Sequence, residues 1–202
     1  MIGIVDYGMG NLRSVENALK KIGQESVISD DPDILYGCEK VILPGVGAFG
    51  DCMKNLQERG LQDVICRMIQ EGKPLLGICV GMQMMYEYSE EKGIHAGLSV
   101  LKGKVIRFET ELPVPEIGWN TLQFKSEHPL REILGDNAFV YYVHSYYASA
   151  CDPDEVIACS EYGGTEVPGI VQKKNVIATQ FHPEKSGETG LRLLRYFAEE
   201  FL

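Results

Sequence analysis

Short apolar runs alternate with helical patterns through the first half of the chain, and this alternation constrains the fold more than any other feature. Runs at Ile2–Asp6, Ser26–Ser29 and Lys40–Leu43 are typical of β-strands, and Pro74–Ile78 precedes a predicted helix over Val80–Tyr88. Apolar residues at helical spacing lie between the runs: Leu12, Val15, Leu19 and Ile22, then Leu61, Val64, Ile65 and Met68. Strands that alternate with helices are joined by right-handed crossovers. We therefore predict an α/β fold with a mostly parallel central sheet and helices on both faces.

The second half of the chain is richer in strand-like segments. A closing helix over Gly187–Leu202 follows them. The predicted strands are Trp119–Phe124, Phe139–Val143, Val156–Cys159 and Val176–Phe181. No linker rich in Pro, Gly, Ser or charged residues divides the chain, so we expect residues 1–202 to form a single domain.

Composition excludes several classes of function. A formal net charge of −10 repels nucleic-acid phosphates, so we expect no nucleic-acid binding. The chain has no apolar run long enough to span a membrane and no secretory signal at its start, which predicts a cytoplasmic protein. Its six cysteines lack CxxC spacing, so neither a disulfide framework nor a zinc site is indicated, and we expect no metal.

The segment Gly77–Gln83 carries the strongest chemical signal. Two glycines, Gly77 and Gly81, bracket Cys79 where a predicted strand gives way to a predicted helix. A sharp turn of this kind lifts a nucleophile above the carboxyl edge of the sheet. The free N–H groups at the helix start favour a negative charge on the sulfur and can later bind an oxyanion. We predict that Cys79 is a nucleophile and that the other cysteines are buried apolar residues.

A thiolate needs a proton-transferring base, and the histidines differ as candidates. His182 follows an apolar strand, and Pro183 turns the chain so that Glu184 can orient the imidazole. His95 and His128 lie in polar, loop-like surroundings, so we expect them to be surface residues. His144 ends an aromatic run, where a core or rim histidine is as consistent with the pattern as a site residue. We predict His182 as the base and Glu184 as its orienting carboxylate.

An oxyanion also needs backbone donors. Pro44–Gly47 follows a predicted strand, and its glycines allow the backbone to approach a ligand closely, although an ordinary turn fits the same residues. The glycines at Gly8 and Gly10 could indicate a dinucleotide site, but Arg13 occupies the position of the third glycine. We therefore expect no nucleotide cofactor.

These segments, taken together, resemble the class I (triad-type) glutamine amidotransferases in order and spacing along nearly the whole chain. The resemblance rests on Pro44–Gly47, Gly77–Gln83 and His182–Glu184. Within that class, further segments look like the glutaminase subunits of imidazole glycerol phosphate synthases: Asp6–Leu12, Pro44–Phe49, Gly118–Asn120 and His182–Ser186. One departure is Glu116, at a position where these relatives often carry a histidine.

The resemblance implies a flavodoxin-like α/β fold and a specific chemistry. It implies hydrolysis of L-glutamine to glutamate and ammonia without a cofactor. In this family the ammonia passes to a (βα)8-barrel cyclase subunit, within a heterodimer that makes imidazole glycerol phosphate and aminoimidazole carboxamide ribotide in histidine biosynthesis. The implied triad is Cys79, His182 and Glu184, with Gly47 and Val80 at the oxyanion and Gln83 and Glu91 on the substrate.

Three alternatives remain open at this stage. The chain could be the glutaminase of another complex, such as a pyridoxal phosphate synthase, which also has a barrel partner. It could be a stand-alone thiol hydrolase on the same scaffold. It could also be a non-catalytic interaction protein in which Cys79 is a redox-sensitive thiol. Glu91 could equally belong to a solvated acidic run with Glu87 and Glu90.

Overall fold

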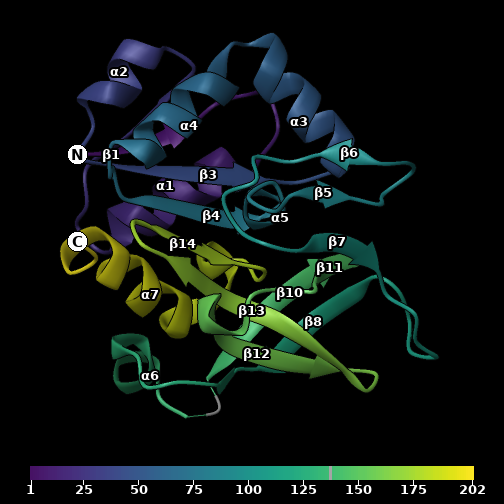
Figure 1. The fold of residues 1–202 in the computed structure, drawn as a ribbon. Helices are drawn as coiled ribbons and strands as arrows, with labels where there is room; N and C mark the ends of the chain where they lie inside the picture. The colour runs from purple at the N-terminus through teal and green to yellow at the C-terminus, as the bar shows by residue number, and fades with distance from the viewer. Residues whose placement is uncertain (137) are drawn as a thin grey trace.

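A computed structural model describes residues 1–136 and 138–202. Within these residues the main sheet has eight strands in the order β2-β1-β3-β4-β14-β13-β12-β9 (Figure 1). The strands are β1 (Ile2–Val5), β2 (Ser26–Ser29), β3 (Lys40–Gly45), β4 (Leu75–Cys79), β9 (Gln123–Phe124), β12 (Val156–Tyr162), β13 (Thr165–Lys173) and β14 (Val176–Thr179). From β2 to β14 neighbouring strands are parallel, whereas β13, β12 and β9 pair antiparallel. The predicted fold class is confirmed.

Helices cover both faces of the parallel strands, as right-handed crossovers require. Helix α1 packs against α7, and α3 packs against α4 (Figure 1). The helices are α1 (Leu12–Lys21), α2 (Pro32–Gly37), α3 (Phe49–Glu58), α4 (Leu61–Gln70), α5 (Val80–Gln83), α6 (Pro129–Leu134) and α7 (Gly187–Glu199). Buried side chains from both halves of the chain form one continuous apolar core.

Two further pieces of β-structure flank the carboxyl ends of the parallel strands. One is a small sheet in the order β11-β7-β5-β6, and the other is an antiparallel ribbon of β8 and β10. Their bounds are β5 (Tyr88–Ser89), β6 (His95–Ala96), β7 (Lys104–Arg107), β8 (Glu116–Thr121), β10 (Phe139–His144) and β11 (Tyr146–Ser149). Short 3-10 turns lie at Pro153–Glu155 and Pro183–Lys185.

The helix predicted over Val80–Tyr88 was wrong in length. Helix α5 ends at Gln83, and strand β5 begins at Tyr88. The carbonyl groups of Met84, Met85 and Tyr86 accept hydrogen bonds from the backbone of residues 98–101 instead of continuing the helix. Tertiary hydrogen bonds thus take the place of the local helix, although the apolar spacing alone is helical.

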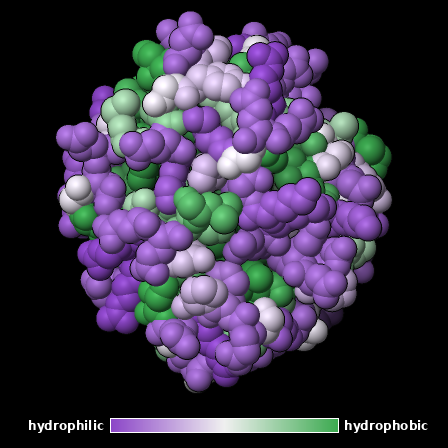
Figure 2. All heavy atoms as spheres, turned by 60° about the vertical axis from the view of Figure 1, so that its left-hand side comes forward, coloured by the Kyte–Doolittle hydropathy of each residue, from purple (hydrophilic) through white to green (hydrophobic). Residues whose placement is uncertain are grey.

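One face of the molecule is largely polar. Figure 2 shows a mainly hydrophilic face on which apolar atoms gather only in small separate patches. Among the described residues, no helix is long and apolar enough to cross a membrane.

Candidate active site

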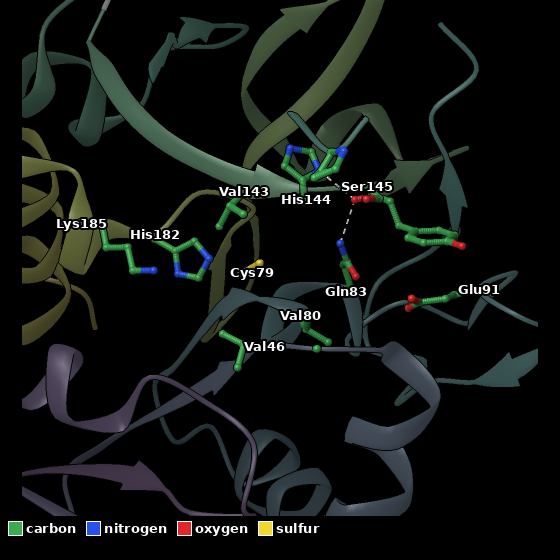
Figure 3. Close-up of a pocket in the computed structure, with 13 residues that line it drawn as sticks. Val46, Cys79, Val80, Gln83, Glu91, Val143, His144, Ser145, His182 and Lys185 are labelled. Carbon is green, nitrogen blue, oxygen red and sulfur yellow. Dashed lines mark hydrogen bonds between the residues drawn. The ribbon is translucent and has the colours of Figure 1, made fainter. Parts of the chain in front are cut away.

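Cys79 lies at the junction of β4 and α5 in a strained backbone conformation. Its φ is 55° and its ψ is −110°, which is rare for a residue with a side chain. Strain of this kind persists only where the surroundings impose it, and it is common at functional sites. The turn points the thiol into a pocket at the carboxyl ends of the parallel strands, between His182 and Gln83 (Figure 3).

The sterics around Gly81 show what imposes this turn. A Cβ built on Gly81 would lie 1.9 Å from the carbonyl oxygen of Leu43 in β3. A Cβ on Gly45 would lie 2.7 Å from the backbone nitrogen of Gly81, and one on Gly77 would lie 2.9 Å from its oxygen. Glycine is therefore needed for α5 to pack directly on β3 and β4. This close packing holds Cys79 above the sheet edge.

The loop Pro44–Gly47 lies beside Cys79 and is tied to the core from below. Residue Gly45 pairs with Cys79 across the parallel strands β3 and β4. The Tyr7 hydroxyl donates to the Pro44 carbonyl at 2.8 Å, and the Cys52 thiol donates to the Val46 carbonyl at 3.4 Å. Gly47 has a φ of 97°, which favours glycine. The loop therefore borders the pocket with its backbone.

His182 and Glu184 form a buried pair beyond the end of β14. His182 Nδ1 lies 2.8 Å from Glu184 Oε1, and the two side chains are 2% and 1% exposed. Burial opposes a charge on the imidazole, but the neighbouring Cys79 sulfur and the hydrogen-bonded Glu184 carboxylate outweigh it and raise the pKa of His182 to about 10. Because Nδ1 faces the carboxylate, Nε2 is the nitrogen left to face the sulfur. The pair can hold a proton beside Cys79.

Ser186 fixes the backbone of this pair to the neighbouring ribbon. Its hydroxyl donates to the His182 carbonyl at 2.7 Å and accepts from the Tyr141 N–H at 2.9 Å. The His182 N–H in turn donates to the Tyr141 carbonyl at 3.0 Å. Strand β10 therefore positions the histidine.

The pocket has a volume of about 330 Å³, which is in the range of small-molecule sites. The pocket is lined by every residue predicted for the site except Glu184, which lies behind His182. The lining members are Gly47, Cys79, Val80, Gln83, Glu91 and His182.

Two polar side chains lie across the pocket from His182. Gln83 Nε2 donates to the Tyr146 carbonyl at 2.9 Å and to Gln180 Oε1 at 3.1 Å. Glu91 is half-buried, and its Oε2 accepts from the Phe49 N–H at 2.7 Å. The carboxylate is thus oriented by a backbone donor rather than left in a solvated acidic run. It offers a negative charge to the pocket.

Part of the pocket wall was not predicted from the sequence. Val143, Ser145, Tyr146 and Lys185 also line the pocket. Only Lys185 had a usable signal, since it follows His182–Glu184 directly. The wall at residues 143–146 depends on how β10 turns into β11, which no local pattern predicts.

The remaining histidines lie in three different settings. His144 is buried and lies 3.1 Å from the equally buried Glu116. His128 caps α6 and contacts Gln172, and His95 packs near Gly50. Both His95 and His128 are half-buried rather than surface residues. In residues 1–136 and 138–202, no cluster of three or more His, Cys, Asp or Glu side chains could hold a metal ion.

Comparison with known proteins gives a consistent result. A family model described as "Glutamine amidotransferase class-I" matches residues 3–201. "Imidazole glycerol phosphate synthase subunit HisH" of Geobacter sulfurreducens is 48% identical over 205 residues, covering 98% of each chain. The protein of the same description from Bacillus cereus strain G9842 is 49% identical over 197 residues, covering 98% of this chain and 93% of its own.

Solved structures share the fold. One described as "Crystal structure of glutamine amidotransferase" superposes with a TM-score of 0.77 and 26% identity, covering 98% of this chain and 97% of its own. "Structure of PurLQS from Thermotoga maritima" gives a TM-score of 0.74 at 20% identity, covering 97% of this chain and 96% of that one. The second likeness concerns the fold alone.

Proposed function

The chain belongs to the class I glutamine amidotransferases, and from this premise we propose that it is the glutaminase subunit of an imidazole glycerol phosphate synthase. Residues 1–202 act as one catalytic domain in this proposal. The observation that carries it is the strained Cys79 facing the buried His182–Glu184 pair, in a chain similar along its whole length to such subunits.

The first half of the reaction forms a thioester. The Cys79 thiolate attacks the side-chain carbonyl carbon of glutamine, and the carbonyl oxygen becomes an oxyanion. Protonated His182 gives its Nε2 proton to the departing nitrogen, the C–N bond breaks, and ammonia leaves. The raised pKa of His182 supports this role, because the imidazole then carries its proton at neutral pH. A glutamyl group stays on Cys79.

The second half is hydrolysis of that thioester. Neutral His182 takes a proton from water, the resulting oxygen nucleophile attacks the thioester carbonyl, and the C–S bond breaks to release glutamate. Glu184 holds the ring through Nδ1 at 2.8 Å, so that Nε2 keeps facing the reacting atoms. Charge separation during both steps is stabilised by the buried carboxylate.

Backbone donors near Gly47 and Val80 bind the oxyanion in this proposal. Both residues line the pocket beside Cys79, on the loop after β3 and at the start of α5. Removal of one such donor typically costs ~10²–10³ in kcat. Across the pocket, Glu91 receives the α-ammonium group of glutamine, and Gln83 offers its side-chain oxygen.

The barrel cyclase docks, in this proposal, on the outer face of the β8/β10 ribbon. Side chains alternate along strands, so Ile117, Trp119 and Phe139 share one face. They are 63%, 55% and 56% exposed, which is unusual for apolar residues this large. Val143 continues the same face into the pocket. A partner seated there would receive ammonia next to where it forms.

Direct transfer has a chemical reason. Free ammonia is mostly ammonium at neutral pH and cannot attack as a nucleophile in that form. We therefore expect weak glutaminase activity in the isolated chain and a rise when the cyclase and its nucleotide ligand bind, transmitted through the Pro44–Gly47 loop.

The test is glutamate release from glutamine by the purified chain, alone and with a barrel cyclase plus its nucleotide ligand. Strong stimulation that disappears in Cys79→Ala supports both the chemistry and the partner. A Cys79-dependent rate that ignores the cyclase would keep the glutaminase but reject this partner, in favour of another complex or a stand-alone hydrolase. Undiminished turnover in Cys79→Ala would reject the mechanism.

A further inference from the structure

Glu116 and His144 form a buried polar pair that the mechanism above does not use. They are cross-strand neighbours at the inner end of the β8/β10 ribbon. Glu116 Oε2 lies 3.1 Å from His144 Nε2, and the side chains are 5% and 3% exposed. The rings of Phe108 and Tyr142 flank the imidazole with centroids at 5.2 and 5.3 Å. A pair so enclosed needs a reason, because burying polar groups is costly.

The hydrogen bonds around the pair define how the imidazole is oriented. His144 Nδ1 lies 2.8 Å from the Tyr146 carbonyl, and a carbonyl only accepts, so Nδ1 carries a proton. Nε2 is then directed at Glu116, whose other oxygen accepts from Asn120 Nδ2 at 3.0 Å. Among the described residues, neither His144 Nε2 nor Glu116 Oε2 makes a hydrogen bond, and the two atoms contact each other at 3.1 Å. Glu116 therefore sets the position of His144.

The Tyr146 carbonyl connects the pair to the substrate pocket. It accepts from both His144 Nδ1 and Gln83 Nε2, at 2.8 and 2.9 Å. Gln83 Nε2 also donates to Gln180 Oε1, so both of its N–H groups are used within the protein. The orientation of the Gln83 amide is thereby determined, with nitrogen toward the wall. Figure 3 shows the hydrogen bond from Gln83 to the Tyr146 carbonyl as a dashed line, and Gln83 near Cys79 in the pocket.

We propose that Glu116 and His144 are positioning residues for glutamine binding: through the Tyr146 carbonyl they keep the Gln83 amide turned so that its oxygen meets the N–H groups of the substrate. The inference rests on the proposed glutaminase function and adds two residues to it. The ligand chemistry it selects is an N–H donor, which glutamine has in its side-chain carboxamide and which the side-chain carboxylate of glutamate lacks.

The test uses steady-state kinetics of glutamate release by the full chain with its cyclase partner. Glu116→Leu removes the partner of His144 Nε2, and His144→Phe removes the donor to Tyr146 while retaining the ring. Each should raise KM for glutamine about tenfold with kcat within about twofold, since the Gln83 amide is then held less firmly against the substrate and it acts in binding, not in the chemistry. Glu116→Gln should recover most of the loss, because its amide can donate to His144 Nε2.

Tyr142→Phe is the matched control. Tyr142 lies on β10, as His144 does, and its substitution removes a buried hydrogen bond to Ser160. The chain of contacts from Glu116 through His144 and Tyr146 to Gln83 stays intact, so KM should be unchanged. The reaction rate of Cys79 with a small neutral thiol reagent should be the same in all variants, because the nucleophile is not altered.

The possible results distinguish failure of the proposed glutaminase function from failure of the positioning role. If the wild-type chain shows no Cys79-dependent glutamate release, the proposed function itself fails. If the wild type is active and Glu116→Leu and His144→Phe keep its KM, the positioning role is overturned. A loss in kcat at constant KM, or an equal loss in Tyr142→Phe, would likewise overturn it, since either would indicate a general structural effect.

Discussion

The N-terminal half of the chain and the C-terminal half supply different parts of the site. β3 and β4 present Cys79, Val80 and Gly47 on backbone that is forced into place by close glycine contacts. The later strands present His182 and Glu184, which are held by side-chain and backbone hydrogen bonds. The first half depends on steric fit and the second on polar contacts. Substitutions of the close-packed glycines in the first half should therefore affect folding most, and substitutions of the polar residues in the second should affect the reaction rate.

The largest effect is expected from a substitution at the close-packed glycines beside Cys79. In Gly81→Ala the new Cβ would lie 1.9 Å from the Leu43 carbonyl oxygen, and backbone cannot yield as a side chain does. We expect the free energy of unfolding to fall by about 3 kcal/mol or more. Urea unfolding measures this. Gly37→Ala is the control, because a Cβ there meets nothing within 4 Å. Equal stability of the two variants would show that steric fit at Gly81 does not hold the Cys79 turn in place.

The next largest effect is expected at His182, in the half of the chain that depends on polar contacts. His182→Asn removes the proton-transferring group and should lower kcat for glutamate release by about 10²–10⁴, with a much smaller change in stability than Gly81→Ala. His128→Asn, a change of the same type in the same half, retains a side chain able to cap α6 and should keep the wild-type rate. A normal rate in His182→Asn would show that another group transfers the proton.

A third prediction concerns the pH dependence of stability. The folded-state pKa of His182 is about 10, above its ordinary value of 6.5, so the folded state favours the protonated ring. This contribution is full below pH 6.5 and is lost as pH rises through about 10. Glu184→Gln weakens the protonated form, so its stability should decline less between these limits than that of the wild type.

Urea unfolding at several pH values across that window measures the difference between the two proteins. Glu188→Gln, an exposed carboxylate on α7, should follow the wild-type curve. Parallel curves for the wild type and Glu184→Gln would mean that the carboxylate does not hold the imidazole in its charged form.

The smallest effect on the isolated chain is expected at the ribbon surface. Trp119→Ala removes an exposed ring that touches no reacting atom, so glutaminase activity without the partner should stay within about twofold. Affinity for the barrel cyclase, measured by calorimetry, should fall by about 10- to 1,000-fold if Trp119 is an anchor of the interface. Ile34→Ala, another exposed apolar residue but on α2, is the control. Unchanged affinity in Trp119→Ala would move the docking face elsewhere.

The same division explains what the sequence could predict. The strands at Ser26–Ser29 and Lys40–Leu43 are confirmed, because continuous apolar runs between turn residues have few alternatives. Helix α3 and strand β13 were not predicted. The α3 pattern begins inside the Pro44–Phe49 motif, and β13 contains Pro168 and Gly169, which weaken a strand signal.

The site residues were predicted from local chemistry and motif resemblance, but their proximity was not. Cys79 and His182 come together because β14 lies next to β4, and that strand order follows from no local pattern. The contact between Glu116 and His144 could not be predicted for the same reason, since it depends on the register of β8 against β10. Glu91 was ambiguous until the Phe49 N–H gave its carboxylate a fixed orientation.

The role of Cys79 as the nucleophile is tested most directly by covalent trapping with a diazoketone analogue of glutamine, followed by mass spectrometry of the peptides. We expect one label per chain, on Cys79 alone among the six cysteines, with protection by glutamine and no label in Cys79→Ala. Labelling of a different cysteine, or of none while glutamine is still hydrolysed, would contradict it.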